Sequence, residues 1–179
     1  MASLVSTSDS PLTRIVHDHG PYVWRVLRRL GVAEADVDDV CQEVFLVVHR
    51  KLAEFEGRST IRTWMYGIAV RAAADYRKRA HRRHEVPTAA MPDHPSPADD
   101  PDRSLQLRQA RSLLDELVGA LDDDKRAVFV LFEIEQLSMQ DVAVALGCPL
   151  QTVYSRLYAA RAQIQAAADR FRAAVGSPS

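Results

Sequence analysis

Apolar positions along the chain follow helical spacing and predict an all-α protein. In the segment AEADVDDVCQEVFLVVHRKLAEF they recur at i, i+3, i+4 and i+7, which is the pattern of a helix that buries one face. Gly is scarce and runs of β-branched residues are short, so we expect helices throughout. The apolar face of this segment consists of Val37, Val40, Cys41, Val44, Phe45, Val48 and Leu52.

Two further helices surround this segment in the first half of the chain. One is predicted from Leu12 to Leu30 and is ended by Gly31. The other follows Gly57, with Ser59 as the expected N-cap, and runs from Thr60 towards Arg83. Its predicted core stripe is Ile61, Trp64, Met65, Ile68 and Ala72. We interpret Trp64 as a core residue rather than as a surface for base stacking.

The residue pattern in the second half of the chain predicts four helices. The first covers about 105–121, and Asp122 is placed to cap a second that runs to about residue 135. Ser138 can cap a third, and a tight turn at Gly147, Cys148 and Pro149 leads into a last helix over about 150–174. The expected inward residues of the last two helices are Met139, Val142, Ala143, Leu146, Val153, Leu157, Ala160 and Ile164.

A segment rich in Pro and Asp, PTAAMPDHPSPADDP, separates the two halves. It has no apolar periodicity and cannot form a packed core, so we interpret it as an extended linker. The predicted organisation is a helical module over 9–84, a flexible linker over 85–103 and a second helical module over 104–172.

Bulk properties favour an ordinary globular protein of the cytoplasm. The chain has 179 residues, 47% apolar and 26% charged, and a formal net charge of -1. The two cysteines are far apart and resemble small buried hydrophobes of a reducing compartment. The Ser-rich start does not resemble a signal peptide, and no apolar run approaches the ~20 residues that membrane insertion requires.

Charge is strongly segregated in the first module. Residues 34–43 carry five acids and no base, whereas 58–84 carry many bases, interleaved with Tyr66 and Tyr76, against the single acid Asp75. A basic helix with aromatic residues suits a nucleic-acid backbone with unstacked bases. A charged helix end with solvated arginines is the plainer alternative. The bases are Arg58, Arg62, Arg71, Arg77, Lys78, Arg79, Arg82 and Arg83.

The last two helices form a candidate helix-turn-helix. The penultimate helix can support the last one, which then fits the DNA major groove. A helical pair joined by a Gly turn is also common as plain structure. Hydroxyl, amide and guanidinium groups on the outward face of the last helix can bond base edges or phosphates. The outward residues are Gln151, Thr152, Tyr154, Ser155, Arg156, Tyr158, Ala159 and Arg161.

Enzyme and metal chemistry find little support in the sequence. A nucleophile elbow, a P-loop and a dinucleotide fingerprint are all missing. Asp38 points away from Asp36 and Asp39 at helical spacing, and His81 and His84 lie among arginines that disfavour a cation. We therefore expect no catalysis, no metal and no cofactor.

Two segments, in this order along the chain, resemble conserved regions of the extracytoplasmic-function (ECF) sigma factors of bacterial RNA polymerase. DVDDVCQEVFLVVHRKLAEFEGRSTIRTWMYGIAVRAAADYRKR resembles their second conserved region, and LDDDKRAVFVLFEIEQLSMQDVAVALGCPLQTVYSRLYAARAQI resembles their fourth. The resemblance covers about 12–172. It implies a factor that binds core polymerase through the β′ clamp helices and the β flap, recognises and melts promoter DNA, and is held in check by an anti-sigma factor.

The resemblance also implies residue roles. It places polymerase docking on Asp36, Asp39, Gln42, Glu43 and Phe45. It places minus-ten recognition, with a flipped-out base, on Gly57, Arg58, Ser59, Arg62, Tyr66, Ile68, Ala69, Arg71 and Arg77. The final helix becomes the minus-thirty-five reader, with Tyr154, Ser155, Tyr158 and Ala159 towards the bases, and the acidic linker would occupy the RNA exit path.

Three departures from the family pattern affect these roles. Many relatives have a basic residue in place of Tyr154, and often another in place of Ala159, so a different upstream promoter sequence is expected. Many also carry Asn in place of Arg71, which affects the base preference. The competing hypotheses are a dimeric helix-turn-helix regulator that binds duplex DNA alone, and an adaptor that binds polymerase without directing transcription.

Overall fold

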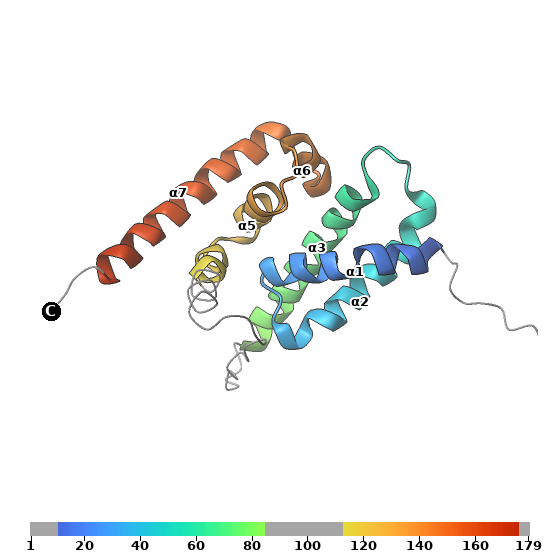
Figure 1. The fold of residues 1–179 in the computed structure, drawn as a ribbon, viewed down its shortest axis with the longest axis horizontal. Helices are drawn as coiled ribbons and strands as arrows, with labels where there is room; N and C mark the ends of the chain where they lie inside the picture. Colours follow the sequence, from blue (N-terminus) through green and yellow to red (C-terminus); the bar gives the residue numbers. More distant parts are fainter. Residues whose placement is uncertain (1–10, 85–112, 176–179) are drawn as a thin grey trace, which may run out of the picture.

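The computed structural model describes residues 11–84 and 113–175, and within these two stretches the secondary structure is helical without any strand (Figure 1). This confirms the predicted all-α class. The predicted linker over 85–103 lies outside the described residues, as does the first part of the helix expected over 105–121.

The first module is a bundle of three long helices. They are α1 (Pro11–Arg29), α2 (Val37–Lys51) and α3 (Ile61–His84), with short 3-10 turns η1 (Glu34–Asp36) and η2 (Leu52–Glu54) at the two ends of α2. Gly31, at φ 91°, ends α1 as expected, and the Val32 amide donates back to the Leu27 carbonyl over 3.0 Å.

Aliphatic side chains from α1 and α2 form the centre of this bundle. Val26, Leu27, Val44 and Val48 are fully buried, and Val44 and Val48 belong to the apolar face that helical spacing predicted. Each such side chain contributes ~1.5–3 kcal/mol relative to its exposed state.

Thr60, not Ser59, caps α3. The Thr60 hydroxyl accepts from the Thr63 amide over 3.0 Å, whereas the Ser59 hydroxyl donates to the Thr60 carbonyl over 3.3 Å. The prediction of Ser59 was therefore wrong by one position, because both residues carry a hydroxyl and only the backbone decides which one faces the free amides.

The second module begins with a helix over 113–119 and continues through α5 (Asp123–Phe129), the π-helix η3 (Val130–Ile134), α6 (Met139–Leu146) and α7 (Leu150–Val175). Both predicted caps are confirmed. Asp122 accepts from the Lys125 amide at 2.9 Å, and Ser138 accepts from the Asp141 amide at 3.1 Å. The helix predicted to follow Asp122 is present, but its second half is wound as a π-helix.

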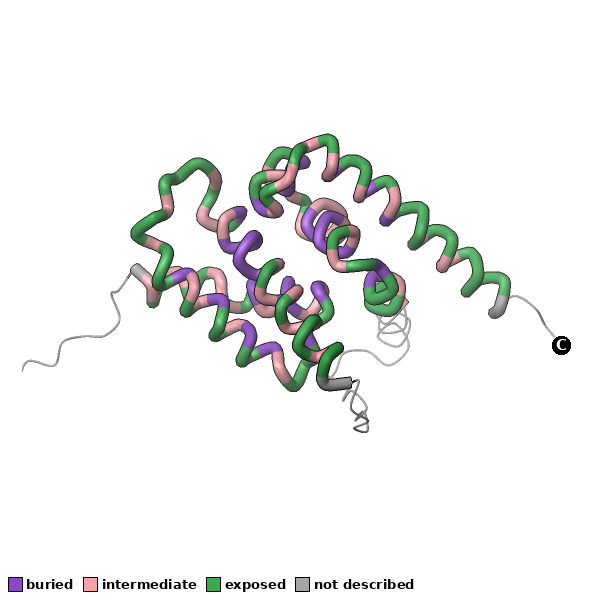
Figure 2. The backbone as a smooth tube through the Cα atoms, turned by 180° about the vertical axis from the view of Figure 1, so that it is seen from behind, coloured by how far each residue is buried: buried purple, intermediate pink, exposed green. Residues whose placement is uncertain are grey.

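The two modules pack together through α3 and α6 (Figures 1 and 2). Residues 65–69 of α3 are all buried, although only one stripe of that helix was expected to face a core. Gly67 shows how close the approach is, since a Cβ added there would lie 2.5 Å from the Ala145 carbonyl oxygen. The second module therefore packs on α3, and we call this arrangement of the two modules the closed chain.

Candidate DNA and polymerase interfaces

The helix-turn-helix consists of α6 and α7. Gly147, at φ 63° and ψ 36°, ends α6 in the left-handed conformation that glycine adopts most readily. Val153, Leu157 and Ala160 are buried against the module, so the opposite face of α7 points outward. The geometry expected of a major-groove helix is present.

Two tyrosines dominate the outward face of α7. Tyr158 is 79% exposed and Tyr154 49% exposed, which is unusual for large aromatic side chains unless a partner covers them. Gln151 and Ser155 are exposed beside them, and Thr152 and Ala159 are half-buried. These phenols can contact bases or phosphates without any rearrangement of the module.

The two arginines of this face are tied back to acids of the same module. Arg156 pairs with Asp124 of α5, and Arg161 pairs with Glu133 of η3 over 2.5 Å. Both were predicted as DNA contacts from their outward spacing. In the closed chain they already have carboxylate partners, so Tyr154 and Tyr158 are the most exposed DNA-binding candidates among the large side chains of α7.

The predicted minus-ten residues divide into an exposed group and a covered group. Gly57, at φ 69°, and Arg58 lie in the exposed loop before α3, where Arg58 pairs with Glu56 over 2.9 Å. Arg71 is also exposed, and its guanidinium lies beside the Gly147 turn. The covered group, with at most 6% exposure, is Tyr66, Ile68 and Ala69. The Tyr66 ring packs on Tyr22 of α1 and its hydroxyl donates to Glu135 of the second module.

Arg77 is also drawn into the closed interface. Its Nη2 lies 2.9 Å from the Asp123 carboxylate, and its side chain is only 17% exposed. Among the described residues, Nε and Nη1 of Arg77 are buried without a hydrogen-bond partner. Leaving donors of a charged group unpaired is costly, so this side of the interface is imperfectly satisfied.

Arg126 crosses the interface nearby. Its guanidinium donates to four backbone carbonyls, namely Val118, Gly119 and Leu121 of its own module and Leu30 of the first. Burial lowers the pKa of Arg126, and the neighbouring Arg77 charge lowers it further. Two guanidinium groups therefore lie close together where the modules meet.

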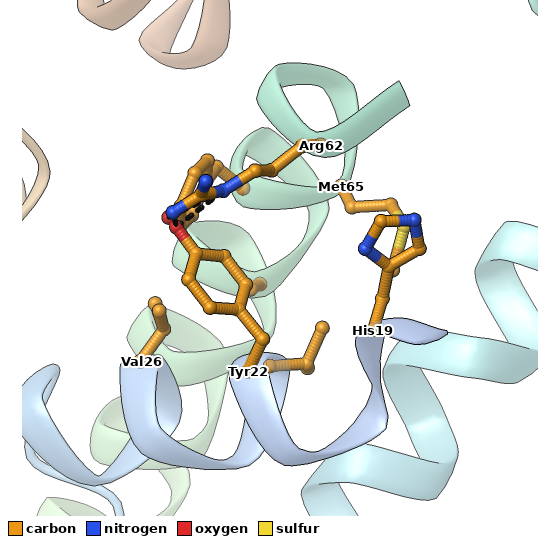
Figure 3. Close-up of a pocket in the computed structure, with 8 residues that line it drawn as sticks. His19, Tyr22, Val26, Arg62 and Met65 are labelled. Atoms are coloured by element: carbon orange, nitrogen blue, oxygen red, sulfur yellow. Dashed lines mark hydrogen bonds between the residues drawn. The ribbon is translucent and has the colours of Figure 1, made fainter. Parts of the chain in front are cut away.

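Glu135 of the second module contacts three side chains of the first module. Its side chain is 5% exposed and pairs with Arg29 of α1 and, at 3.9 Å, with Arg62 of α3. The Tyr66 hydroxyl donates to it over 3.0 Å. Arg62 in turn donates to the hydroxyl of Tyr22, whose ring meets that of Tyr66 edge-on at 5.2 Å. Figure 3 shows Tyr22 extending from α1 to meet Arg62.

This contact changes the chemistry of Tyr22. Burial, opposed by the hydrogen bond from Arg62 and supported by the nearby Glu135 charge, raises the pKa of Tyr22 to about 12. Tyr22 therefore stays a neutral phenol. Sequence spacing did not identify Tyr22, Arg29 or Glu135, because their proximity depends on how the two modules pack.

The predicted docking face of α2 is mostly exposed. Asp39, Gln42 and Glu43 are exposed, and Glu43 pairs with Arg79 over 3.1 Å. Asp36 is half-buried and accepts from the Tyr76 hydroxyl at 2.6 Å, which makes it partly structural. Phe45 is half-buried and packs against the core.

Leu46 was missed by the sequence reasoning. It is 55% exposed and follows Asp39, Gln42 and Glu43 at i+7, i+4 and i+3, so it lies on the same face of α2. An apolar side chain among acids suits a protein partner, because apolar burial adds affinity while the charges give specificity.

Neither metal binding nor membrane insertion finds structural support. Within 11–84 and 113–175, the His, Cys, Asp and Glu side chains form no cluster of three that could hold a metal ion. A helix long and apolar enough to cross a membrane does not occur in those stretches either. Cys41 and Cys148 are both free and half-buried.

These features define a two-module helical protein with a helix-turn-helix. Comparisons with known proteins identify its family. Residues 15–83 match the model for sigma-70 region 2, and 111–164 match sigma-70, region 4. The ECF RNA polymerase sigma-E factor of Haemophilus influenzae is 30% identical over 142 residues, which is 75% of each chain. The chain belongs to the ECF sigma factors, a family of transcription initiation factors.

Other relatives agree with this placement. The sigma-E factor of Escherichia coli K12 is 31% identical over 74% of each chain, and the sigma factor CnrH of Cupriavidus metallidurans is 29% identical over 94% of this chain and 92% of its own. The solved structure of CnrH with the cytosolic domain of CnrY has a TM-score of 0.65 at 28% identity, covering 89% of this chain and 88% of CnrH.

A second solved structure supports the fold alone. The sigma factor RpoE in complex with the anti-sigma factor NepR, from Bartonella quintana, has a TM-score of 0.65 at 20% identity, covering 85% of this chain and 92% of its own. The helical architecture is thus shared with a protein of only 20% sequence identity.

Proposed function

We propose that this chain directs promoter-specific transcription by core RNA polymerase, with α2 docking on the enzyme, α3 and its preceding loop opening the minus-ten element, and α7 binding the minus-thirty-five element. It supplies recognition and strand opening, with no catalysis of its own, and acts in the cytoplasm. The site residues are those predicted from the sequence, with Leu46 added to the docking face.

The observation that carries the proposal is the exposed aromatic face of α7. Tyr154 and Tyr158 are large side chains held in solvent on the second helix of a helix-turn-helix, in a chain of the sigma family. Burying them without a partner would be favourable, so their exposure indicates a surface that a ligand covers.

Docking on polymerase is supported by charge and by exposure. Asp39 and Glu43 offer carboxylates on one face of α2, and Leu46 offers apolar area between the helix and its partner. Such a face suits the basic surface expected of the β′ clamp helices. The linker acids, outside the described residues, would lie in the RNA exit path.

Minus-ten recognition requires the modules to separate. Tyr66 is 2% exposed in the closed chain and its hydroxyl donates to Glu135 of the second module, so a flipped base cannot reach it there. Opening a base costs a few kcal/mol, which a pocket that stacks and bonds the base would offset. Polymerase, by holding the two modules apart, would make the pocket available.

An anti-sigma factor would inhibit the docking of this chain on polymerase. The similar CnrH has been solved with the cytosolic domain of CnrY, and the family pattern predicts such a partner here. A protein that covers the exposed face of α2 would compete with polymerase for Glu43 and Leu46.

The test is reconstituted transcription. Core polymerase and the purified chain are incubated with a library of double-stranded promoter fragments, and the RNA 5′ ends are sequenced. We expect transcripts that share two upstream elements and that disappear without the chain. RNA from no template, or a palindromic footprint without polymerase, would overturn the proposal.

A further inference from the structure

We propose that Tyr22, Arg29, Arg62 and Tyr66 form a binding site for a backbone phosphate of single-stranded DNA, and that Glu135 fills this site until the two modules separate. The four residues are called the cationic site below. The inference rests on the proposed function, and it adds α1 to the surface that would contact the opened strand.

The first argument is the donor set around the Glu135 carboxylate. Two guanidinium groups and one phenol converge on a single carboxylate, with Arg29 on one oxygen and Arg62 and Tyr66 on the other. Arginine forks match carboxylate and phosphate oxygens equally well. A site that holds one of these anions with three donors can therefore hold the other.

The second argument is that the cationic site is preorganised by its own module. The Arg62 guanidinium lies 4.0 Å from the centre of the Tyr22 ring and also bonds the Tyr22 and Tyr66 hydroxyls. These contacts come from α1 and α3 alone, so they persist when the second module leaves.

The third argument is that Glu135 arrives by an irregular stretch of backbone. It follows the π-helix η3, where its amide donates to the Val130 carbonyl at 2.9 Å, and it precedes Gln136 at φ 57°. Single π-turns are rare and concentrate at functional sites, and a left-handed Gln is uncommon. Both features set the position of Glu135 at the module boundary.

The fourth argument is charge balance. Among the described residues, Glu135 is the only carboxylate that pairs with Arg29 or with Arg62. When the modules separate, both guanidinium groups lose their acid, and an anion from another source becomes favourable. The opened promoter strand, which carries a phosphate at every nucleotide, supplies that anion close to the predicted minus-ten loop.

The experiment measures binding of a fluorescent ten-nucleotide oligo(dT) to the full-length chain by anisotropy across a salt series. Glu135→Gln removes the competing charge and should tighten binding by about tenfold, as expected when a closed state is destabilised. Gly67→Ala should tighten it similarly, because the added methyl meets the Ala145 carbonyl while every donor stays in place. Glu116→Gln, which removes one exposed acid of the second module, is the matched control and should change nothing.

A second layer of variants tests the phosphate itself. In the Glu135→Gln chain, Arg29→Ala should remove the gain and lower the salt slope by about 0.7, the value for one phosphate of a single strand. Arg50→Ala, an exposed base of α2, is the control for general charge and should keep most of the gain. Oligo(dT) with uncharged methylphosphonate linkages should show no gain from Glu135→Gln.

Three results would overturn the inference: unchanged affinity for both Glu135→Gln and Gly67→Ala, an unchanged salt slope for Arg29→Ala, or equal gains for charged and uncharged oligonucleotides. Promoter-dependent transcription by the wild-type chain separates this failure from failure of the proposed function. If transcription succeeds while the oligonucleotide results are negative, only the phosphate site is lost.

Discussion

The outward face of α7 and the buried face of α3 are both predicted DNA surfaces, but they differ in solvent exposure in the closed chain. Tyr158 of α7 is 79% exposed, whereas Tyr66 of α3 is 2% exposed. Both are tyrosines on helices with basic neighbours. What separates them is that Tyr66 packs on Tyr22 and donates to Glu135 of the second module, whereas Tyr158 keeps most of its surface in solvent.

This difference indicates which step of initiation the closed chain withholds. The proposed duplex-binding face of α7 and the proposed docking face of α2 are exposed in the closed chain. Tyr66, one of the residues proposed for strand opening, is instead engaged by Glu135 of the second module. On this proposal the chain would meet polymerase before it could open DNA, and the two unpaired nitrogens of Arg77 lower the stability of the closed state.

The largest effect is expected from Glu43→Lys on the exposed docking face. Reversing this charge would place a lysine beside Arg79 and against a basic partner, so affinity for core polymerase should fall by at least ~30-fold. Co-elution with core enzyme on a sizing column measures it, with Asp115→Lys on the second module as the control. Retained co-elution at unchanged helicity would count against α2 as the docking helix.

A smaller effect is expected from Tyr158→Ala on the open face of α7. Upstream-element binding by the holoenzyme should weaken by about tenfold, whereas transcription from a pre-melted template should be retained. The free energy of unfolding should change by less than ~0.5 kcal/mol, because the side chain is mostly in solvent. Phe171→Ala, further along α7, is the matched aromatic control. Equal losses on both templates would refute a role limited to the upstream element.

The smallest effect is expected from Arg77→Ala. In the holoenzyme it should weaken promoter binding to a similar extent for all sequences and lower the salt slope by about 1, as for one phosphate contact. In the free chain, stability should change by no more than ~1 kcal/mol, because the lost Asp123 pair and the relieved polar burial oppose each other. Arg170→Ala provides the control. A sequence-dependent loss would instead indicate base contact.

The sequence was sufficient for the elements and much of each core. Helical spacing located Val44 and Val48, and the side chains of Asp122 and Ser138 identified two helix starts, because caps and stripes are local properties. Gly31 and Gly147 likewise end their helices in the left-handed region.

The contacts between modules could not be predicted in the same way. Glu135 pairs with Arg29 across 106 positions, and its place depends on a π-helix that the pattern of apolar residues does not reveal. The single core stripe predicted for α3 included Ile68 but not Tyr66 or Ala69, whose burial depends on packing that the stripe does not reveal. The charges assigned to DNA from that helix, above all Arg77, therefore have a second role in the closed chain.

Closure of the free chain is tested most directly by small-angle X-ray scattering of the wild type and of Gly67→Ala. An alanine at 67 favours the α3 helix but cannot fit against the Ala145 carbonyl, so it should separate the modules without unfolding either. Gly20→Ala on α1, where an added Cβ meets nothing within 4 Å, is the control. We predict a compact wild type and control and a larger radius of gyration for Gly67→Ala. Three superimposable curves with the large radius of two separate modules would contradict the closed arrangement.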